Sequence, residues 1–172
     1  VSEKKMYGDT MKVFRELEAL FTDIPMILGS DNRKMSKSYD NHIPLEFTEK
    51  QTEKRLRSFY TDPKKVHQGD PGHPQGCPIF LLHRIYTENA DKQIAPPCKT
   101  GELGCVDCKM ILAKNLNASL APIRERQDEL LKNPDYVWDV LATGRDRARA
   151  RAGNVMEKVR TAMKMNYRGK KK

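Results

Sequence analysis

The sequence predicts a mainly α-helical protein, in which an extended polar loop precedes a bundle of about four or five helices. Three observations support this prediction. The 172 residues are 32% charged and only 7% aromatic, a composition unlike that of a β-sandwich or a membrane protein. From Asp107 onward, apolar residues recur at spacings of three, four and seven, the period of an amphipathic helix. No segment alternates strands with helices, and no apolar run approaches the length of a bilayer span.

The first half of the chain is expected to contain short elements separated by turns. Residues 11–20 carry apolar side chains at intervals of three, which suits a short helix or an irregular segment. Residues 24–29 form an apolar, strand-like stretch that ends in glycine. A capping box at 48–51 predicts a helix that stops at 61–63. Pro78 suits the first position of the next helix.

The second half carries the stronger helical signals. The helix that begins near Asp107 contains Pro122, which removes a backbone donor and is expected to kink or restart it. Residues 133–134 have the Asn-Pro form of an N-cap and first helical position, and Gly144 is expected to close that short helix. A last helix is then expected to end near Asn166.

The positive charge is concentrated at the C-terminal end. The whole formal net charge of +9 is contained in residues 145–172, and the rest of the chain is balanced. A cationic helix of this kind is typical of nucleic-acid binding, and less often of binding to an anionic membrane surface. A solvated face with no partner is the remaining alternative.

One short loop has the composition of a polyphosphate site. Residues 33–38 place three cations and two hydroxyls behind Gly29. Ammonium groups offset phosphate charge, and hydroxyls and backbone donors bind phosphate oxygens. If the same residues stood in an arbitrary order, we would interpret them as an ordinary surface loop, so the order in which they occur decides the interpretation.

The four cysteines form one constellation, and the sequence contains no others. Cys77, Cys98, Cys105 and Cys108 are spaced C-x20-C-x6-C-x2-C. In a reducing cytoplasm such a set favours a metal or cluster site over disulfides. Four thiolates suit either Zn²⁺ or an iron–sulfur cluster.

Lys34-Met35-Ser36-Lys37-Ser38 reads KMSKS, the second signature of class I aminoacyl-tRNA synthetases. Three further tracts follow in order: Thr-Asp-Pro at 61–63, Asp-Pro-Gly through Cys-Pro at 70–78, and Leu-Ala-Pro-Ile-Arg-Glu-Arg at 120–126. Together with Pro25 to Asn41, they make the chain resemble bacterial-type tryptophanyl-tRNA synthetases from about Tyr7 to Met165. Tyrosyl-tRNA synthetases match these tracts less well.

The resemblance implies an enzyme that activates tryptophan with ATP and Mg²⁺ and transfers it to its tRNA. Residues Lys34, Met35, Ser36, Lys37 and Ser38 would bind the ATP phosphates, with Lys34 and Lys37 as catalytic residues that stabilise the pyrophosphate leaving group. The family usually has Asp-Gly before Arg-Lys, whereas this chain has Asp-Asn at 31–32. Asparagine also tolerates positive φ, so the loop can keep its form.

The resemblance also implies a domain organisation. Residues 1–45 would be the end of the catalytic domain with the KMSKS loop, 46–166 a helical anticodon-binding domain with the cysteines, and 167–172 a disordered basic tail. The family's other signature, of the His-x-Gly-His type, is not in this sequence, so most of the Rossmann-type catalytic domain is expected to be absent. We therefore expect the isolated chain to be inactive. The four histidines are isolated in sequence and are interpreted as surface or structural residues.

A subset of these synthetases resembles the chain in having such a cysteine set, which in those proteins holds a [4Fe–4S] cluster. Cys77, Cys98, Cys105 and Cys108 would then be the ligands, with Lys99 and Lys109 offsetting negative charge. Zinc is one alternative, and thiols that are unliganded or linked by disulfides are the other. The expected partners are tryptophan-specific tRNA, ATP and the catalytic half, in a homodimeric cytoplasmic enzyme that does not bind a membrane.

Two other interpretations of the function remain open: a stand-alone metal- or cluster-containing tRNA-binding module, and a small metal-binding nucleic-acid protein unrelated to synthetases.

Overall fold

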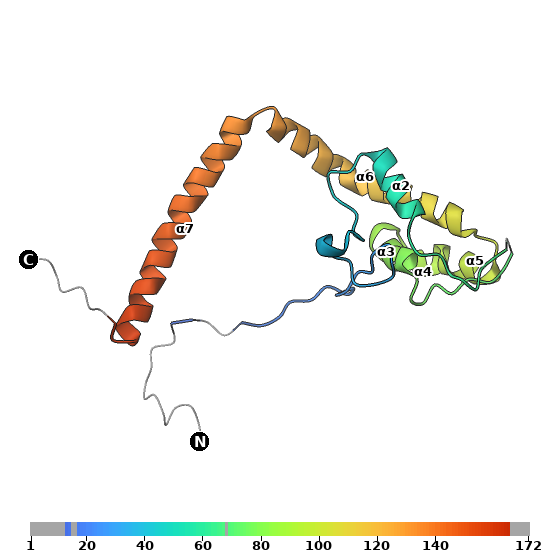
Figure 1. The fold of residues 1–172 in the computed structure, drawn as a ribbon, viewed down its shortest axis with the longest axis horizontal. Helices are drawn as coiled ribbons and strands as arrows, with labels where there is room; N and C mark the ends of the chain where they lie inside the picture. The colour runs from blue at the N-terminus through green and yellow to red at the C-terminus, as the bar shows by residue number, and fades with distance from the viewer. Residues whose placement is uncertain (1–12, 15–16, 68, 166–172) are drawn as a thin grey trace, which may run out of the picture. The chain divides into compact units, whose positions relative to one another are not determined.

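The computed structural model describes residues 13–14, 17–67 and 69–165, and these residues are mainly helical (Figure 1). They divide into two compact units: Phe21–Glu129, and a second unit drawn from the two ends of the chain, Val1–Leu20 and Leu130–Lys172. The described part contains no named strand, only an isolated antiparallel bridge between Leu28 and Lys34. Its helices are η1 (Lys37–Tyr39), α2 (Glu49–Arg57), α3 (Pro78–Tyr86), α4 (Ala90–Gln93), α5 (Ala95–Thr100), α6 (Cys105–Leu131) and α7 (Pro134–Ala162).

Two predicted helix starts are confirmed with their caps. Thr48 accepts a hydrogen bond from the Gln51 backbone, and the Gln51 side chain accepts one from the Thr48 backbone, so both donors at the start of α2 are satisfied. Pro78 occupies the first turn of α3, where its missing N–H has no helical partner to lose. These caps fix where α2 and α3 enter the core.

The core of the unit Phe21–Glu129 lies between α2, α3 and α6. Its main cluster joins the end of α2 to one face each of α3 and α6: Leu56, Phe59, Ile79, Leu82, Leu112, Ala113, Leu116 and Leu120. A smaller cluster gathers around α4 and α5: Phe80, Ala90, Ile94 and Ala95. Cys77 and Cys108 pack against both clusters. Each fully buried leucine contributes roughly 1.5–3 kcal/mol of transfer free energy.

Two features of this unit refine the predictions. Of the two outcomes expected at Pro122, a kink or a restart, the restart does not occur, because α6 continues across Pro122 as one helix. The short helices α4 and α5 were not predicted from the sequence. Pro96 and Pro97 lie in the first turn of α5, where the backbone donors have no intrahelical acceptor and proline is tolerated.

The second unit contains the other corrections. The predicted stop at Gly144 is wrong, because α7 runs without interruption to Ala162. A single glycine costs about 1 kcal/mol relative to alanine, which the alanine- and arginine-rich flanks offset. For residues 11–20, where a short helix or an irregular segment was expected, the described residues are irregular, and Leu17 and Leu20 are 93% and 98% exposed. Spacings of three drift around a 3.6-residue helix and form no single face. The predicted tail at 167–172 lies outside the described residues.

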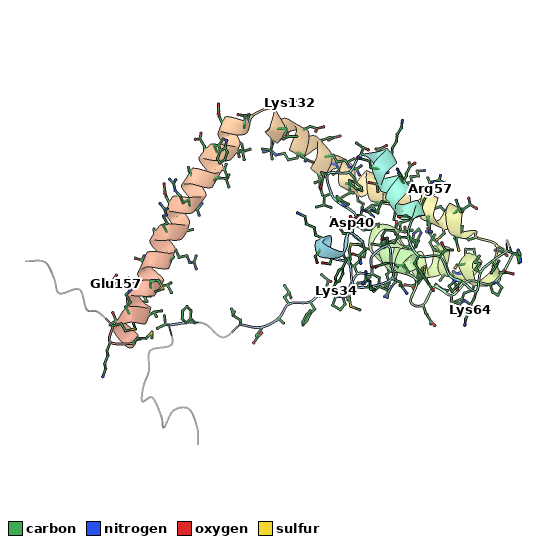
Figure 2. All side chains as sticks on the ribbon, in the orientation of Figure 1. Lys34, Asp40, Arg57, Lys64, Lys132 and Glu157 are labelled. Atoms are coloured by element: carbon green, nitrogen blue, oxygen red, sulfur yellow. The ribbon has the colours of Figure 1, made fainter. Side chains whose placement is uncertain are left out.

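The two units also differ in burial. Figure 2 shows side chains crowded between α2, α3 and α6, whereas those along α7 project from the helix on several sides. No residue of α7 is buried. Among the described residues, no helix combines the length and the apolar composition that a bilayer crossing requires.

Candidate functional site

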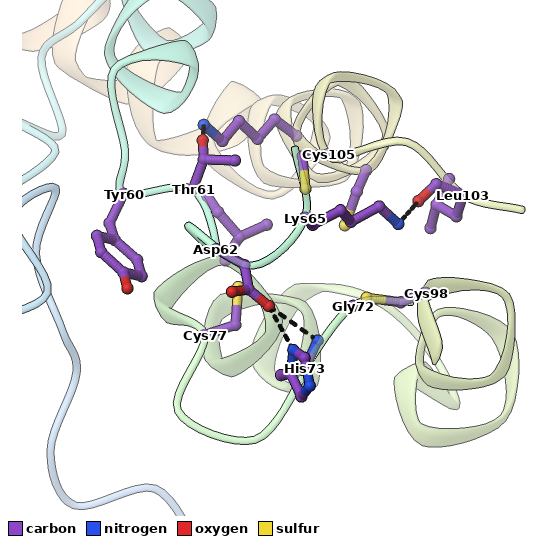
Figure 3. Close-up of a pocket in the computed structure, with 13 residues that line it drawn as sticks. Tyr60, Thr61, Asp62, Lys65, Gly72, His73, Cys77, Cys98, Leu103 and Cys105 are labelled. Carbon is purple, nitrogen blue, oxygen red and sulfur yellow. Dashed lines mark hydrogen bonds and ion pairs between the residues drawn. The ribbon is translucent and has the colours of Figure 1, made fainter. Parts of the chain in front are cut away.

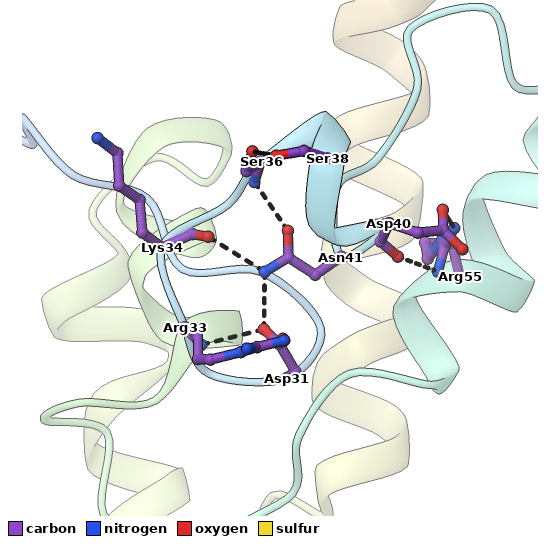
Figure 4. A network of polar contacts seen from close by, with 8 residues as sticks. All are labelled: Asp31, Arg33, Lys34, Ser36, Ser38, Asp40, Asn41 and Arg55. Atoms are coloured by element: carbon purple, nitrogen blue, oxygen red, sulfur yellow. Dashed lines mark hydrogen bonds and ion pairs between the residues drawn. The ribbon is translucent and has the colours of Figure 1, made fainter.

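The signature loop, residues 30–41, is folded around one buried asparagine side chain (Figure 4). The Asn41 amide is only 1% exposed. It donates to the Asp31 carboxylate at 2.7 Å and to the Lys34 carbonyl at 3.1 Å, and its oxygen accepts from the Ser36 backbone at 2.8 Å. Three separate points of the loop are therefore fixed to one side chain.

Backbone geometry at the start of the loop requires a glycine. A Cβ on Gly29 would lie 2.4 Å from the Asn41 side chain and 2.6 Å from its carbonyl oxygen. The Gly29 N–H donates to the Arg33 carbonyl at 2.7 Å, which closes a tight turn. Asn32 within that turn has φ 63°, so the residue that replaces the usual glycine does adopt the left-handed conformation.

The turn also carries a stabilised carboxylate. The hydrogen bond from Asn41, supplemented by the backbone and guanidinium of Arg33, lowers the pKa of Asp31 to about 2. Arg33 Nε lies 2.6 Å from the carboxylate. The Arg33 guanidinium also stacks 4.9 Å from the centre of the Tyr39 ring. Arg33 is thus occupied within the loop.

The two predicted catalytic lysines are left exposed by this arrangement. Among the described residues neither Lys34 nor Lys37 has an ion-pair partner, and Figure 4 shows Lys34 directed away from the hydrogen-bonded network. The Ser36 and Ser38 hydroxyls lie 2.8 Å apart. The Met35 side chain is half-buried and packs against the main core, so it anchors the loop. Two ammonium groups and two hydroxyls are therefore presented on one anchored segment.

The signature loop is attached to the end of α2 at two places. The Arg55 guanidinium pairs with the Asp40 carboxylate at 2.9 Å and donates to the Asp40 carbonyl at 3.2 Å. The Tyr60 N–H donates to the Ser30 carbonyl at 2.7 Å. Both ends of the loop are thereby linked to the same short stretch of chain.

The four cysteines gather around one cavity, which we call the cysteine pocket (Figure 3). Cys77 is the N-cap of α3, Cys98 lies in α5, and Cys105 and Cys108 lie in the first turn of α6. All four are half-buried free thiols. The sequence prediction that they converge on one place agrees with this arrangement.

The thiols are not arranged as a ligand set in this structure. Among the described residues, no three His, Cys, Asp or Glu side chains are close enough to hold a metal ion. The cavity has a volume of about 30 Å³. Binding of an ion or a cluster therefore requires the thiols to reorient.

Burial determines the protonation of these thiols. It raises the pKa of Cys108 to about 12, and it raises the pKa of Cys77 and of Cys98 as well. All three are consequently protonated at neutral pH in the structure. A metal ion would displace those protons, because only the thiolate is a strong ligand.

A buried histidine supports the first turn of α6. His83 is 0% exposed, and its Nε2 lies 3.0 Å from the Cys108 carbonyl, which can only accept. Nε2 therefore carries the proton, and Nδ1 accepts from the Thr87 hydroxyl at 2.7 Å. Burial lowers the pKa of His83, which agrees with this neutral form. The interpretation of His83 as a structural residue is confirmed.

Two buried lysines line the cysteine pocket. Lys65 is 9% exposed and donates to the Leu103 carbonyl at 2.7 Å. Lys109 is 5% exposed, and burial lowers its pKa. Lys99, expected beside the thiols, is exposed and does not line the pocket. The pocket lining also contains a hydrogen bond in which Asp62 accepts from His73 Nδ1 at 2.7 Å.

Four arginines are candidate phosphate contacts because of their charge, and they fall into different environments: Arg124, Arg126, Arg147 and Arg151. Arg124 is half-buried and donates to Thr52 and Asn117 at 3.0 Å, which is a structural role. Arg126 is exposed and pairs with Glu129 at 2.7 Å. Arg147 and Arg151 are exposed on α7.

Sequence reasoning missed Asn41 and Lys65. Asn41 is one polar residue in a polar loop, and only its burial distinguishes it. Lys65 stands in an ordinary charged stretch with no periodic signal.

An exposed KMSKS segment on a braced loop, next to a helical core, defines a class I aminoacyl-tRNA synthetase module. A family model described as "tRNA synthetases class I (W and Y)" matches residues 3–121, and the chain belongs to this family. Within it, the chain is similar to tryptophan–tRNA ligases. That of Aquifex aeolicus is 42% identical over 163 residues, covering 94% of this chain and 40% of the relative. That of Thermotoga maritima is 42% identical over 158 residues, covering 91% and 48%.

A solved structure agrees with both the fold and the family. The tryptophanyl-tRNA synthetase of Campylobacter jejuni, complexed with ADP and tryptophan, superposes with a TM-score of 0.72 at 28% identity. The match covers 92% of this chain and 50% of that one. The chain thus spans about half the length of the relatives it matches, or less.

Proposed function

We propose that the chain is the C-terminal part of a tryptophan–tRNA ligase and that its signature loop binds the phosphates of ATP. The observation that carries the proposal is the pair of exposed ammonium groups at Lys34 and Lys37, which have no ion-pair partner among the described residues, on a loop braced by Asn41. The family membership and the tryptophan–tRNA ligase relatives support the same function.

The chemistry follows from where charge develops. When the tryptophan carboxylate attacks the α-phosphate of ATP, negative charge accumulates on the departing pyrophosphate. Lys34 and Lys37 would stabilise that charge, and each well-placed donor is worth about 3 kcal/mol. Mg²⁺ bound to the nucleotide would share the task. Ser36, Ser38 and the loop backbone would orient the phosphate oxygens.

The test is Lys37→Ala in the intact ligase. We expect tryptophan-dependent pyrophosphate exchange to fall about a hundredfold in kcat, with little change in the KM for tryptophan. Lys50→Ala, an exposed lysine on α2, is the matched control and should leave the rate unchanged. A Lys37→Ala enzyme with the wild-type rate would contradict the assigned role.

The domain organisation is part of the proposal. Residues 1–45 would complete the catalytic domain and 46–166 would form the anticodon-binding domain. The isolated chain would bind ATP phosphates weakly and would not activate tryptophan. Pyrophosphate exchange measured with the 172-residue chain alone tests this, and a tryptophan-dependent signal would refute it.

We further propose that Cys77, Cys98, Cys105 and Cys108 hold a [4Fe–4S] cluster, with zinc as the alternative. The support is the convergence of all four thiols of the chain on one pocket between the two core clusters. Such a group would cross-link α3, α5 and the start of α6, and it would act structurally, because tryptophan activation has no redox step. Lys65 and Lys109 would offset its negative charge.

Metal analysis of protein purified without oxygen distinguishes these groups. A cluster predicts absorbance near 400 nm with four irons and four sulfides per chain. One zinc per chain without iron would establish the alternative. Protein with neither metal would reject both.

We propose that α7 contacts the phosphate backbone of tRNA near the anticodon, in a homodimeric cytoplasmic enzyme. Arg147 and Arg151 are four residues apart and therefore share one exposed face of the helix. Replacing both with glutamine should reduce the slope of log K against log salt by about 2. Lys92→Gln on α4 is the control with an exposed cation outside α7. An unchanged slope would remove α7 from the interface.

A further inference from the structure

Lys109 connects the first turn of α6 to the stretch of chain that follows α2, in which Tyr60 and Thr61 also line the cysteine pocket (Figure 3). It directly follows Cys108 on α6, and its side chain is almost fully buried. Its ammonium donates to three oxygens: the Arg57 carbonyl at 3.1 Å, the Phe59 carbonyl at 2.7 Å and the Thr61 hydroxyl at 2.8 Å. All three acceptors lie in residues 57–61, which we call the α2-end segment.

This contact occurs where a cation is most favourable. The last carbonyls of a helix lack intrahelical donors and carry the negative end of its dipole. Arg57 is the last residue of α2, so the Lys109 ammonium completes the hydrogen bonding of that helix end. One side chain of α6 thus fixes the conformation in which the chain leaves α2.

The other side of the same segment holds the signature loop. Tyr60 lies between two of the Lys109 acceptors, and its N–H donates to the Ser30 carbonyl at 2.7 Å. Ser30 in turn donates to the Asn41 carbonyl at 2.8 Å. One turn earlier, Arg55 pairs with Asp40. Continuous contacts therefore run from Cys108 through Lys109 and the α2-end segment to the signature loop.

We propose that Lys109 is a positioning residue that couples the cysteine pocket to the signature loop through the α2-end segment. The proposal rests on the phosphate-binding role proposed for that loop. A group bound by Cys105 and Cys108 would fix the first turn of α6, and with it the position of Lys109. Loss of the bound group would therefore loosen the attachment of Ser30 and increase opening of the signature loop, although that loop contains no cysteine.

The first test is amide hydrogen exchange of the intact protein with Lys109→Met. We expect the Tyr60, Ser30 and Ser36 amides to exchange about tenfold faster, because exchange reports local opening. Lys65→Met is the matched control, since it removes a second buried lysine of the same pocket, whose hydrogen bond within the described part of the chain goes to the Leu103 carbonyl. Faster exchange confined to residues 58–61 in the Lys109 variant, or equal loop exchange in both variants, would overturn the proposal.

The second test removes the bound group. Iron or zinc chelation should accelerate loop exchange in the wild type and add little in Lys109→Met, because the link is already broken. Additive effects would contradict the coupling. If the purified protein contains no metal, the cluster proposal fails, and the Lys109→Met comparison still decides the positioning role.

Kinetics separate positioning from general stability. In the intact ligase, Lys109→Met should lower kcat for pyrophosphate exchange severalfold while the KM for tryptophan stays constant, and Lys109→Arg, which keeps a charged donor, should restore most of the rate. If circular dichroism shows that Lys109→Met does not fold, Thr61→Val removes one of the three acceptors and should accelerate loop exchange in the same direction. Wild-type exchange in Thr61→Val, together with no rescue by arginine, would reject the role.

Discussion

The signature loop and the cysteine pocket lie in the same compact unit, but only the loop has its functional side chains held in a defined arrangement. In the loop, hydrogen bonds to Asn41 already hold the backbone that presents Lys34 and Lys37. In the pocket, four thiols lie near one another, but the described residues do not provide a ligand geometry. The comparison teaches that a contiguous motif specifies a finished local structure, whereas spaced ligands specify proximity and leave the final arrangement to the bound group.

The largest expected difference concerns thiol reactivity. Cys108, with its pKa raised from 9.0 to about 12 by burial, has about a thousandfold less thiolate at neutral pH than in the unfolded chain. Metal-free folded protein should therefore alkylate at Cys108 about a thousandfold more slowly than urea-unfolded protein. Mass spectrometry of iodoacetamide-treated samples measures the alkylation rate of Cys108. In both states that rate should rise as pH increases. Equal rates in the two states would show that the pocket is open.

Removing the asparagine brace should have the next largest effect. Asn41→Ala leaves the Asp31, Lys34 and Ser36 groups without their shared partner, at a cost of about 3 kcal/mol. Urea denaturation measures the loss. Asn115→Ala, which removes one half-buried bond to Thr87, should cost only about 1 kcal/mol. Similar costs for the two would mean that Asn41 does not organise the loop.

A methyl group at the start of the loop tests the close approach of its backbone. Gly29→Ala would force the new Cβ against Asn41 and should destabilise the unit by about 2 kcal/mol. Gly144→Ala meets no atom within 4 Å in the middle of α7 and should stabilise that helix by about 0.5–1 kcal/mol. Thermal unfolding of both variants reports the signs. Stabilisation by Gly29→Ala would contradict the packing described here.

The smallest effect is the pH dependence of the loop. The folded-state pKa of Asp31 is lowered from 3.8 to about 2, so its contribution is complete above pH 4 and is lost as pH falls through 2. The stability difference between wild type and Asp31→Asn should therefore shrink across that interval. Unfolding measured from pH 6 downward reveals it. If the stability difference between wild type and Asp31→Asn stays constant across this pH range, the effect of Asp31 does not come from its charge.

The sequence predicts the elements whose signal is local. The capping box at 48–51, the Pro78 start of α3 and the long apolar repeat of α6 each depend on residues within a few turns, and the structure confirms them. The motif at 34–38 identifies the loop for the same reason. The converging cysteines were likewise expected from their number and spacing.

The failures arise where tertiary context decides. Gly144 indicates a helix end, but with no competing turn contact the helix continues past it. The short α5 was not predicted from the sequence, and the burial of Ala95 and its neighbours favours it. Lys65 matters because its partner Leu103 lies far along the chain, and Asn41 matters because the folded loop surrounds it, and neither fact leaves a periodic pattern in the sequence.

The single tryptophan of this sequence, Trp138, lies on α7 with 68% of its surface exposed. A lone indole in water emits at long wavelength and is readily quenched by acrylamide. Because the chain contains no second indole, any blue shift in its emission would come from whatever covers this face of α7. The protein therefore contains a built-in fluorescent probe for contacts made by that helix.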